Sequence, residues 1–332
     1  MAIMYSRPNR ALLESLKFLS VPCLLAASLV CKYWNSVANH REVWLLLLST
    51  TGLPGQSTLS PKACYQTAFQ TFLVAFDRFA VHRYYPVTGK WRSTALSAGL
   101  DIGQFVLGKP QRCDIRAVLI GRELAFCWGN TAFRVVIVNL LSGICQSKAT
   151  MVFPRRYPGL CILGNYVYAF CGSYQAKETS ICERFALQLE RWSSLPQATS
   201  PRQSFNPAPH KELIYLAGGG SPFIETFTPQ TTSFHVVSVD FTRLDCATTL
   251  LVQDCLYVFN DLRCASWSLA SSQYTTRSYT VRESCSVVTA PLAWGSCGLF
   301  LCTFWRGWKV CKLNFTTLQC EVVGVMVDKA LT

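Results

Sequence analysis

The chain has 332 residues, of which half are hydrophobic and 15% are charged. Such a composition supports a large core and excludes a chain that is disordered over most of its length. The formal net charge is +13, but the basic residues occur singly or in pairs rather than in a dense stripe. We therefore expect acidic partners and do not expect binding to nucleic acid.

The 17 cysteines do not follow a metal-binding spacing, because no Cys-x-x-Cys pair occurs. Many lie in apolar runs such as residues 159–163, where a reduced cysteine serves as a small hydrophobic residue. We predict reduced cysteines, no metal and no cofactor in a cytoplasmic or nuclear protein. The alternative is a secreted protein, with residues 24–30 in a cleaved signal and a glycosylation sequon at Asn314. No stretch reaches the ~18–20 apolar residues of a membrane span, so no membrane partner is expected.

Between residues 11 and 48 the apolar residues recur at helical spacing in short pieces, and Pro22 separates the first two. Three short helices cannot bury these faces among themselves, so a partner must cover part of the surface. Residues 24–38 contain a Leu-Leu pair, a Val-Cys-Lys element and Trp34, and this segment resembles the F-box. Glu42-Val43-Trp44 resembles the end of that module, whereas Arg7 replaces the leucine that the family places before Pro8.

This resemblance implies docking onto the Skp-type adaptor subunit of a cullin–RING ubiquitin ligase complex. Trp34 would hold the helices together. The residues that the resemblance places at the partner contact are Pro8, Leu12, Leu16, Leu24, Leu25, Val30, Cys31 and Trp34. The alternative is a helical lid that packs on the rest of the chain.

The remainder of the chain repeats a pair of residues with six residues between its members. The pairs are Tyr84/Trp91, Val138/Cys145, Phe185/Trp192, Phe227/Phe234, Trp267/Tyr274 and Leu313/Cys320. Successive first members lie 54, 47, 42, 40 and 46 residues apart, which suits a four-stranded unit. Each pair predicts a hairpin in which one strand ends at the first member, a four-residue turn follows, and the next strand begins at the second.

A β-rich segment precedes most of these pairs. Such segments are predicted at residues 124–127, 166–170, 213–217, 256–259 and 299–302. Several end in glycine, most clearly at Gly218-Gly219-Gly220. The order of these features resembles the kelch repeat: an apolar strand, then glycines, an aromatic residue, six residues and a tryptophan. The resemblance extends over residues 65–327.

Together the two resemblances imply a mainly β protein, a six-bladed kelch-type β-propeller preceded by a small α-helical F-box-like module. We expect the F-box-like module at residues 1–49, a linker at 50–64 and the propeller at 65–332. The first unit lacks sequence for its innermost strand, and residues 320–327 are expected to close the ring against residues 72–76.

A set of arginines precedes the first strand of successive units: Arg112, Arg156, Arg202, Arg243 and Arg282. Rotational repetition would place them around one mouth of the ring, and Arg155, Arg263 and Arg306 are predicted to lie in connecting loops that reach the same mouth. Arginine forks bind carboxylates and phosphates, so the predicted target is an acidic or phosphorylated protein segment. The alternative is that these arginines brace the loops, since kelch repeats often carry an arginine here.

No Gly-x-Ser-x-Gly motif, P-loop or distinctive carboxylate pair occurs, so we do not expect an enzyme. The predicted function is substrate recognition for an SCF-type ubiquitin ligase, in which the F-box docks the Skp-type adaptor and the propeller binds the target. The alternative is a stand-alone kelch scaffold for protein–protein interaction without a ligase connection.

Overall fold

The computed structural model divides the chain into two compact units, Met1–Phe72 with Tyr85–Gly89, and Leu73–Tyr84 with Lys90–Thr332. In the smaller unit residues 43–45 form a helical turn in which Val43 and Trp44 are buried. The residues that the structure describes are 43–45, 72–76, 80–86, 88–97, 116–121, 123–128, 135–175, 177–238, 248–252, 254–259, 263–271, 274–278, 286–287, 292–294, 297–304, 307–315, 317 and 319–327.

The described strands form six antiparallel sheets, numbered I to VI in chain order, each built from consecutive strands. Sheet I contains β1 (Leu73–Phe76), β2 (Ala80–Tyr85) and β3 (Lys90–Ala95). Sheet II contains β4 (Arg116–Ile120), β5 (Leu124–Trp128), β6 (Val135–Asn139) and β7 (Cys145–Lys148). Sheet III contains β8 (Gly159–Leu163), β9 (Tyr166–Tyr174), β10 (Lys177–Ala186) and β11 (Arg191–Leu195).

The other three sheets follow the same pattern. Sheet IV contains β12 (Ala208–His210), β13 (Leu213–Leu216), β14 (Ile224–Thr228) and β15 (Ser233–Ser238). Sheet V contains β16 (Thr248–Val252), β17 (Cys255–Phe259), β18 (Arg263–Ser268) and β19 (Tyr274–Ser278). Sheet VI contains β20 (Ser286–Val287), β21 (Leu292–Trp294), β22 (Cys297–Phe304), β23 (Gly307–Asn314) and β24 (Cys320–Val327). The protein is therefore mainly β, as its sequence predicts.

The repeated residue pairs face each other across hairpins, which confirms the predicted role of their spacing. Phe185 lies opposite Trp192 in the register of β10 and β11, and their ring centroids are 5.4 Å apart. Tyr84 and Trp91 make the corresponding ring contact in sheet I, at 5.2 Å. The pairs Val138/Cys145, Phe227/Phe234, Trp267/Tyr274 and Leu313/Cys320 are in register across their hairpins as well.

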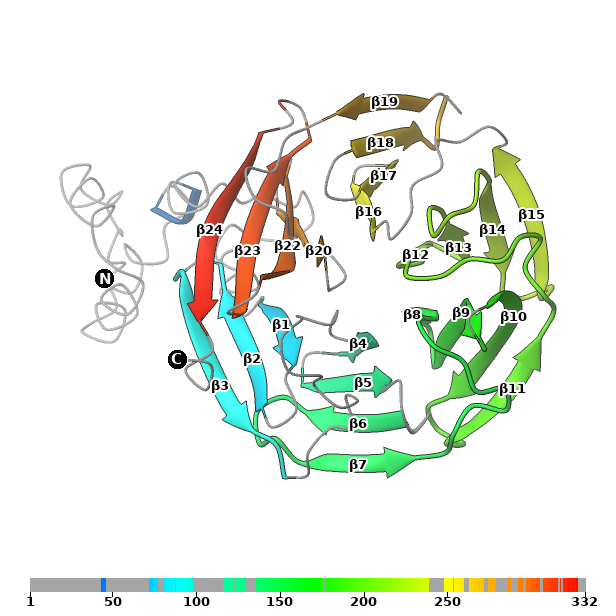
Figure 1. Cartoon of the computed structure of the whole chain (residues 1–332), viewed down its shortest axis with the longest axis horizontal. Coiled ribbons are helices and arrows are strands. Elements are labelled where there is room, and N and C mark those ends of the chain that lie inside the picture. The colour runs from blue at the N-terminus through cyan, green and yellow to red at the C-terminus, as the bar shows by residue number, and fades with distance from the viewer. Residues whose placement is uncertain are drawn as a thin grey trace, which may run out of the picture. The chain divides into compact units, whose positions relative to one another are not determined.

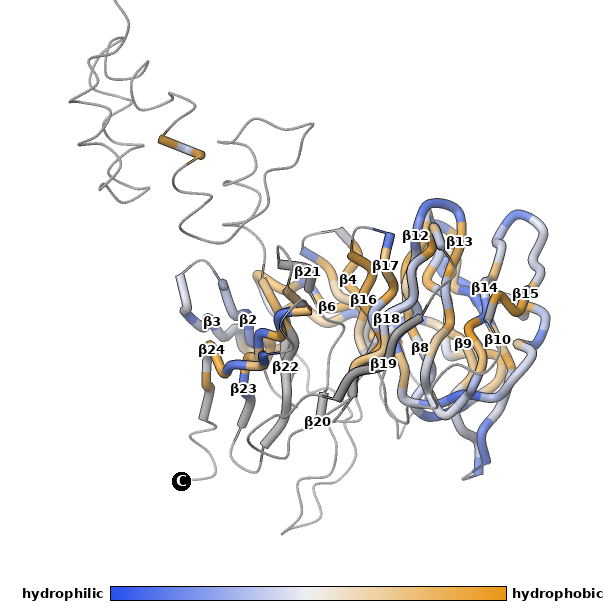
Figure 2. The backbone as a smooth tube through the Cα atoms, turned by 90° about the horizontal axis from the view of Figure 1, so that it is seen from above, coloured by the Kyte–Doolittle hydropathy of each residue, from blue (hydrophilic) through white to orange (hydrophobic). Residues whose placement is uncertain are grey.

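The cores lie between successive sheets. Phe185 and Trp192 of sheet III share an apolar cluster with Val135 of sheet II. The remaining clusters join sheets III and IV, sheets IV and V, and sheets V and VI, and they contain Phe227, Trp267 and Leu313 respectively. Figure 2 shows the hydrophilic turn between β12 and β13. The first member of each of these hairpin pairs is thus a core residue at a junction between sheets.

Polar contacts join sheet I to its neighbours. The Ser97 amide donates to the Gly143 carbonyl at 2.9 Å, which connects the segment after β3 to sheet II. The Tyr84 hydroxyl donates to the Val323 carbonyl of sheet VI at 3.0 Å, beside Gly324, where a Cβ atom would come within 2.7 Å of the Tyr84 ring. Each sheet therefore contacts the next in chain order, and the last contacts the first.

The expectation that residues 320–327 pair with residues 72–76 is wrong. These residues form β24, which pairs with β23 in sheet VI, while β1 pairs with β2. Within the larger unit, Figure 1 shows β24 on the outer side of its sheet and β1 on the inner side of sheet I. Sheet VI uses β24 to complete its own hairpin, and side-chain contacts rather than a shared ladder connect the first and last sheets.

Candidate ligand-binding site

The candidate site lies at one end of sheet III. Because the sheet is antiparallel, β8 begins, β9 ends, β10 begins and β11 ends at this same end. The segment from sheet II therefore enters here, through residues 149–158, and the segment to sheet IV leaves here, through residues 196–207. Both connecting segments and the tip of the β9–β10 hairpin meet at this end.

Arg155 holds the entering segment in place from inside the protein. Its guanidinium donates to Glu183 Oε2 at 2.8 Å and to the Ala169 carbonyl at 2.9 Å. The other Glu183 oxygen accepts a hydrogen bond from the Phe153 amide at 3.1 Å. The side chains of Arg155 and Glu183 are 0% and 1% exposed, so the ion pair is buried.

Arg202 repeats this arrangement in the next unit. Its guanidinium donates to Glu225 Oε1 at 2.7 Å and to the Gly218 carbonyl at 2.9 Å. The other Glu225 oxygen accepts a hydrogen bond from the Thr199 amide at 2.8 Å. Both side chains are fully buried. Each glutamate thus pairs with an arginine and accepts a hydrogen bond from a backbone amide of the connecting segment, which replaces part of the hydrogen bonding that these groups lose on leaving water.

Arg155 and Arg202 brace loops, which is the alternative that the sequence left open for these arginines. A guanidinium without exposed surface cannot contact a ligand, so we do not retain these two residues as substrate contacts. The glutamates that pair with them were missed by sequence reasoning. Their signal is a glutamate two residues before the aromatic member of a hairpin pair, as in Glu183-x-Phe185 and Glu225-x-Phe227.

The segment after Arg155 lies directly against the end of β9. The amides and carbonyls of Arg156 and Ser173 exchange two hydrogen bonds, at 2.8 and 2.7 Å. Gly172 has φ +114°, and a Cβ atom there would lie 2.6 Å from the Arg156 carbonyl oxygen. The Ser204 amide of the leaving segment donates to the Tyr157 carbonyl at 3.1 Å. Glycine at position 172 is therefore required for this close approach of two backbones.

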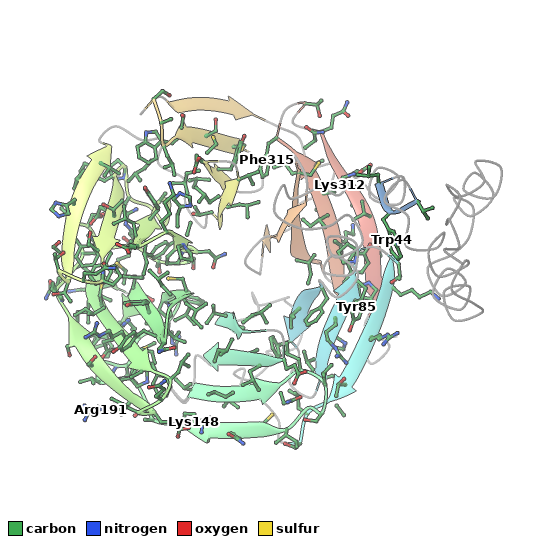
Figure 3. The ribbon with its side chains drawn as sticks, turned by 180° about the vertical axis from the view of Figure 1, so that it is seen from behind. Trp44, Tyr85, Lys148, Arg191, Lys312 and Phe315 are labelled. Carbon is green, nitrogen blue, oxygen red and sulfur yellow. The ribbon has the colours of Figure 1, made fainter. Side chains whose placement is uncertain are left out.

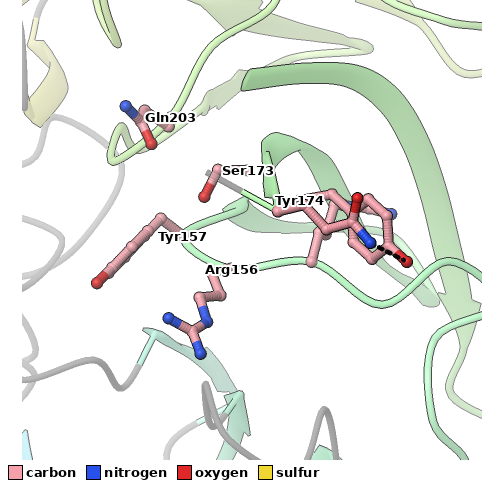
Figure 4. A pocket seen from close by; sticks show the side chains of 7 residues that line it. Arg156, Tyr157, Ser173, Tyr174 and Gln203 are labelled. Carbon is pink, nitrogen blue, oxygen red and sulfur yellow. Dashed lines mark hydrogen bonds between the residues drawn. The ribbon is translucent and has the colours of Figure 1, made fainter. Parts of the chain in front are cut away.

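A hollow of about 570 Å³ opens between these segments. Figure 4 shows Arg156, Tyr157, Ser173 and Gln203 around it, together with Tyr174 at the end of β9. The backbones of Tyr157 and Ser204, one of them lining the hollow, have φ values of +52° and +53°. Such left-handed conformations cost about 1–2 kcal/mol for residues with a side chain, and they persist only where surrounding hydrogen bonds hold them.

Arg156 is the predicted arginine that the structure places at this hollow with an exposed side chain. The prediction that Arg263 lies in a connecting loop is wrong, because Arg263 is the first residue of β18 and its backbone pairs with Ser278 of β19; its side chain is outside the described residues. The other predicted site residues lie outside the described residues. They are the arginines Arg112, Arg243, Arg282 and Arg306, and the predicted adaptor contacts Pro8, Leu12, Leu16, Leu24, Leu25, Val30, Cys31 and Trp34.

Cys161, Cys171 and Cys182 are free thiols in the apolar cluster between sheets III and IV. Burial raises the pKa of the Cys161 thiol well above its ordinary value. The pKa of Cys171 is also raised, because its thiol hydrogen-bonds to Cys182 and because it is buried. Protonated thiols are poor nucleophiles and metal ligands, so Cys161 and Cys171 act here as packing residues. The described residues contain no group of three or more His, Cys, Asp or Glu side chains placed to hold a metal ion.

Comparison with known families places a domain at the N-terminus. Residues 8–47 match the family described as F-box-like. No curated protein matches the sequence. Among the described residues, no helix is long and apolar enough to cross a membrane. The chain therefore carries an F-box-like domain followed by a β-rich region, and F-box domains generally bind Skp-type adaptors in cullin complexes.

Proposed function

We propose that this protein is a substrate-recognition adaptor of an SCF-type ubiquitin ligase, without enzymatic activity of its own, in the cytoplasm or nucleus. The observation that carries this proposal is the F-box-like match at residues 8–47. The Skp-type adaptor contacts an apolar surface that consists of Pro8, Leu12, Leu16, Leu24, Leu25, Val30 and Cys31. Trp34 holds together the helices that carry these residues. The second region of the chain then carries the target to the ligase.

We further propose that the six sheets are the blades of a kelch-type β-propeller. Three observations support this architecture. Each sheet consists of consecutive antiparallel strands, and each successive pair of sheets is joined by a core cluster or by hydrogen bonds. The contact between Tyr84 and Val323 connects the last sheet to the first. A closed ring of sheets explains why no sheet needs a second layer to bury its faces.

The target binds at the end of the propeller where the connecting segments lie. The residues that remain proposed contacts are Arg112, Arg156, Arg243, Arg263, Arg282 and Arg306. Arginines collected at one mouth favour an acidic or phosphorylated segment of the target. The buried ion pairs of Arg155 and Arg202 support this arrangement, because they fix the loops on which neighbouring residues are presented.

Co-expression with a Skp-type adaptor tests the proposal. The wild-type chain is expected to retain the adaptor in a pull-down, and the variant Leu25→Asp, Val30→Asp is expected to lose it. A matched variant, Leu189→Asp, changes an exposed leucine in the β10–β11 turn and keeps the adaptor bound. A folded wild-type chain that does not retain the adaptor contradicts the ligase function and leaves a stand-alone kelch scaffold as the better account.

A further inference from the structure

The hollow at sheet III has a composition that indicates the charge of its ligand. Its described lining consists of arginine, tyrosine, serine and glutamine, with no acidic side chain. The nearby carboxylates of Glu183 and Glu225 are buried in ion pairs with Arg155 and Arg202. Arg156, by contrast, is exposed and makes no ion pair with another described residue. The described lining therefore presents one uncompensated positive charge.

Ser173 provides a second polar group directed at a ligand. The residue is only 8% exposed, lines the hollow, and uses its backbone amide and carbonyl to bind Arg156. Its hydroxyl makes no hydrogen bond within the described part of the chain. The Ser173 hydroxyl is not fully enclosed, so it is open to the hollow and can donate a hydrogen bond to a ligand or to water there.

The rest of the lining suits the backbone of a peptide. Tyr174 is 42% exposed, and its ring is held by Phe153 at a centroid distance of 5.0 Å. Among the described residues, the Gln175 side chain makes one long contact, with the Tyr174 hydroxyl at 3.4 Å. Amide side chains such as those of Gln175 and Gln203 pair with peptide N–H and C=O groups, and an exposed, rigid tyrosine supplies an apolar contact beside them.

From this geometry we propose that the hollow binds the carboxylate of an aspartate or glutamate side chain in an extended, unphosphorylated segment of the target. Arg156 forms a forked pair with the carboxylate, and the Ser173 hydroxyl donates to the same group. Phosphate dianions are recognised by clusters of arginines, whereas a single guanidinium balances the single charge of a carboxylate. The inference rests on the proposed function, since it names the kind of target that the adaptor selects.

Selection from peptide pools tests the inference. The full-length protein, co-expressed with the Skp-type adaptor and immobilised, is exposed to three pools of capped peptides. The pools have a central glutamate, glutamine or phosphoserine, flanked by randomised uncharged positions. We expect the glutamate pool to be retained at least about tenfold more strongly than the glutamine pool, and more strongly than the phosphoserine pool. Equal retention of glutamate and glutamine, or preferential retention of phosphoserine, overturns the inference.

Matched arginine variants assign the preference to the hollow. Arg156→Ala is expected to abolish the preference for glutamate. Arg156→Lys is expected to retain only part of it, because lysine keeps the positive charge but cannot donate two parallel hydrogen bonds to one carboxylate. Arg191→Ala removes an exposed arginine from the outer strand β11 and leaves the preference unchanged (Figure 3). An unchanged preference in folded Arg156→Ala contradicts the inference.

The same samples separate this inference from the proposed function. Retention of the Skp-type adaptor without a glutamate preference refutes the carboxylate site and leaves the adaptor function standing. A glutamate preference without retention of the adaptor refutes the ligase connection and leaves the site standing.

Discussion

Sheets III and IV differ from sheets II, V and VI at one strand position. Two residues before the first member of the hairpin pair, sheets III and IV have Glu183 and Glu225, and each glutamate forms a buried ion pair with an arginine of the preceding segment. The corresponding residues in sheets II, V and VI are Val136, Ala265 and Cys311. None of these three side chains can neutralise a guanidinium, so the same brace cannot form there.

This difference indicates that the strand residue decides whether the buried ion pair can form. Where a glutamate stands on the strand, the arginine is buried and organises the connecting segment through carbonyl and carboxylate oxygens. Where the strand has Val136, Ala265 or Cys311 instead, that position supplies no carboxylate, and we expect the arginine to be available to a ligand. Arg112, Arg243 and Arg282 precede the sheets that lack the glutamate, which is why they remain proposed target contacts.

The largest effect is expected from breaking the buried Arg202–Glu225 ion pair in sheet IV. Arg202→Met leaves Glu225 buried without its cation, which is expected to lower the free energy of unfolding by about 3–5 kcal/mol. The double variant Arg202→Met, Glu225→Met removes both charges and is expected to lose less stability than the single variant. Urea unfolding measures both. A double variant less stable than the single one would contradict the assignment of a mutually compensated pair.

A smaller effect is expected from adding a methyl group near the buried Arg155–Glu183 ion pair in sheet III. Gly172→Ala combines a positive φ with a Cβ atom 2.6 Å from the Arg156 carbonyl oxygen, so the connecting segment must move. Gly164→Ala, in the β8–β9 turn, has φ +59° and no atom within 4 Å of its Cβ. We expect Gly164→Ala to cost about 1–2 kcal/mol of unfolding free energy and Gly172→Ala to cost more. Equal losses in thermal unfolding would show that the segment is not packed as described.

The smallest effect concerns a partly exposed ion pair that connects sheets II and III. Lys148 donates to Glu190, and their side chains are 15% and 53% exposed; Figure 3 shows Lys148 on the outer strand of sheet II. Glu190→Gln is expected to change the free energy of unfolding by less than about 1 kcal/mol, because water screens a partly exposed pair. Raising the salt concentration should reduce even that difference. If Glu190→Gln lowers the free energy of unfolding as much as Arg202→Met does, the predicted difference between this ion pair and the buried one is wrong.

The strands and hairpins could be predicted from the sequence because their signals are local. The spacing of Phe185 and Trp192 fixes a turn of set length, and the β-rich segments upstream pair with neighbours in the chain. The strand β24 was misplaced, since its apolar sequence shows that it is a strand but does not show which strand it pairs with.

The candidate site was only partly predictable. Arg155 and Arg156 are adjacent and chemically identical, yet one is buried and the other is exposed. That distinction depends on Glu183, 28 residues further along the chain, and on the left-handed backbone of Tyr157. Neither contact follows from composition or periodicity, because one is non-local and the other places a tyrosine where glycine is usual.

Urea unfolding of Arg155→Met and Arg156→Met tests the central claim. The claim is that Arg155 stabilises the connecting segment, whereas Arg156 is free to contact a ligand. We predict that Arg155→Met lowers the free energy of unfolding by about 3–5 kcal/mol, because Glu183 is left buried and uncompensated. Arg156→Met is predicted to change it by less than about 0.5 kcal/mol, as for other exposed substitutions. Equal losses in the two variants would contradict this claim.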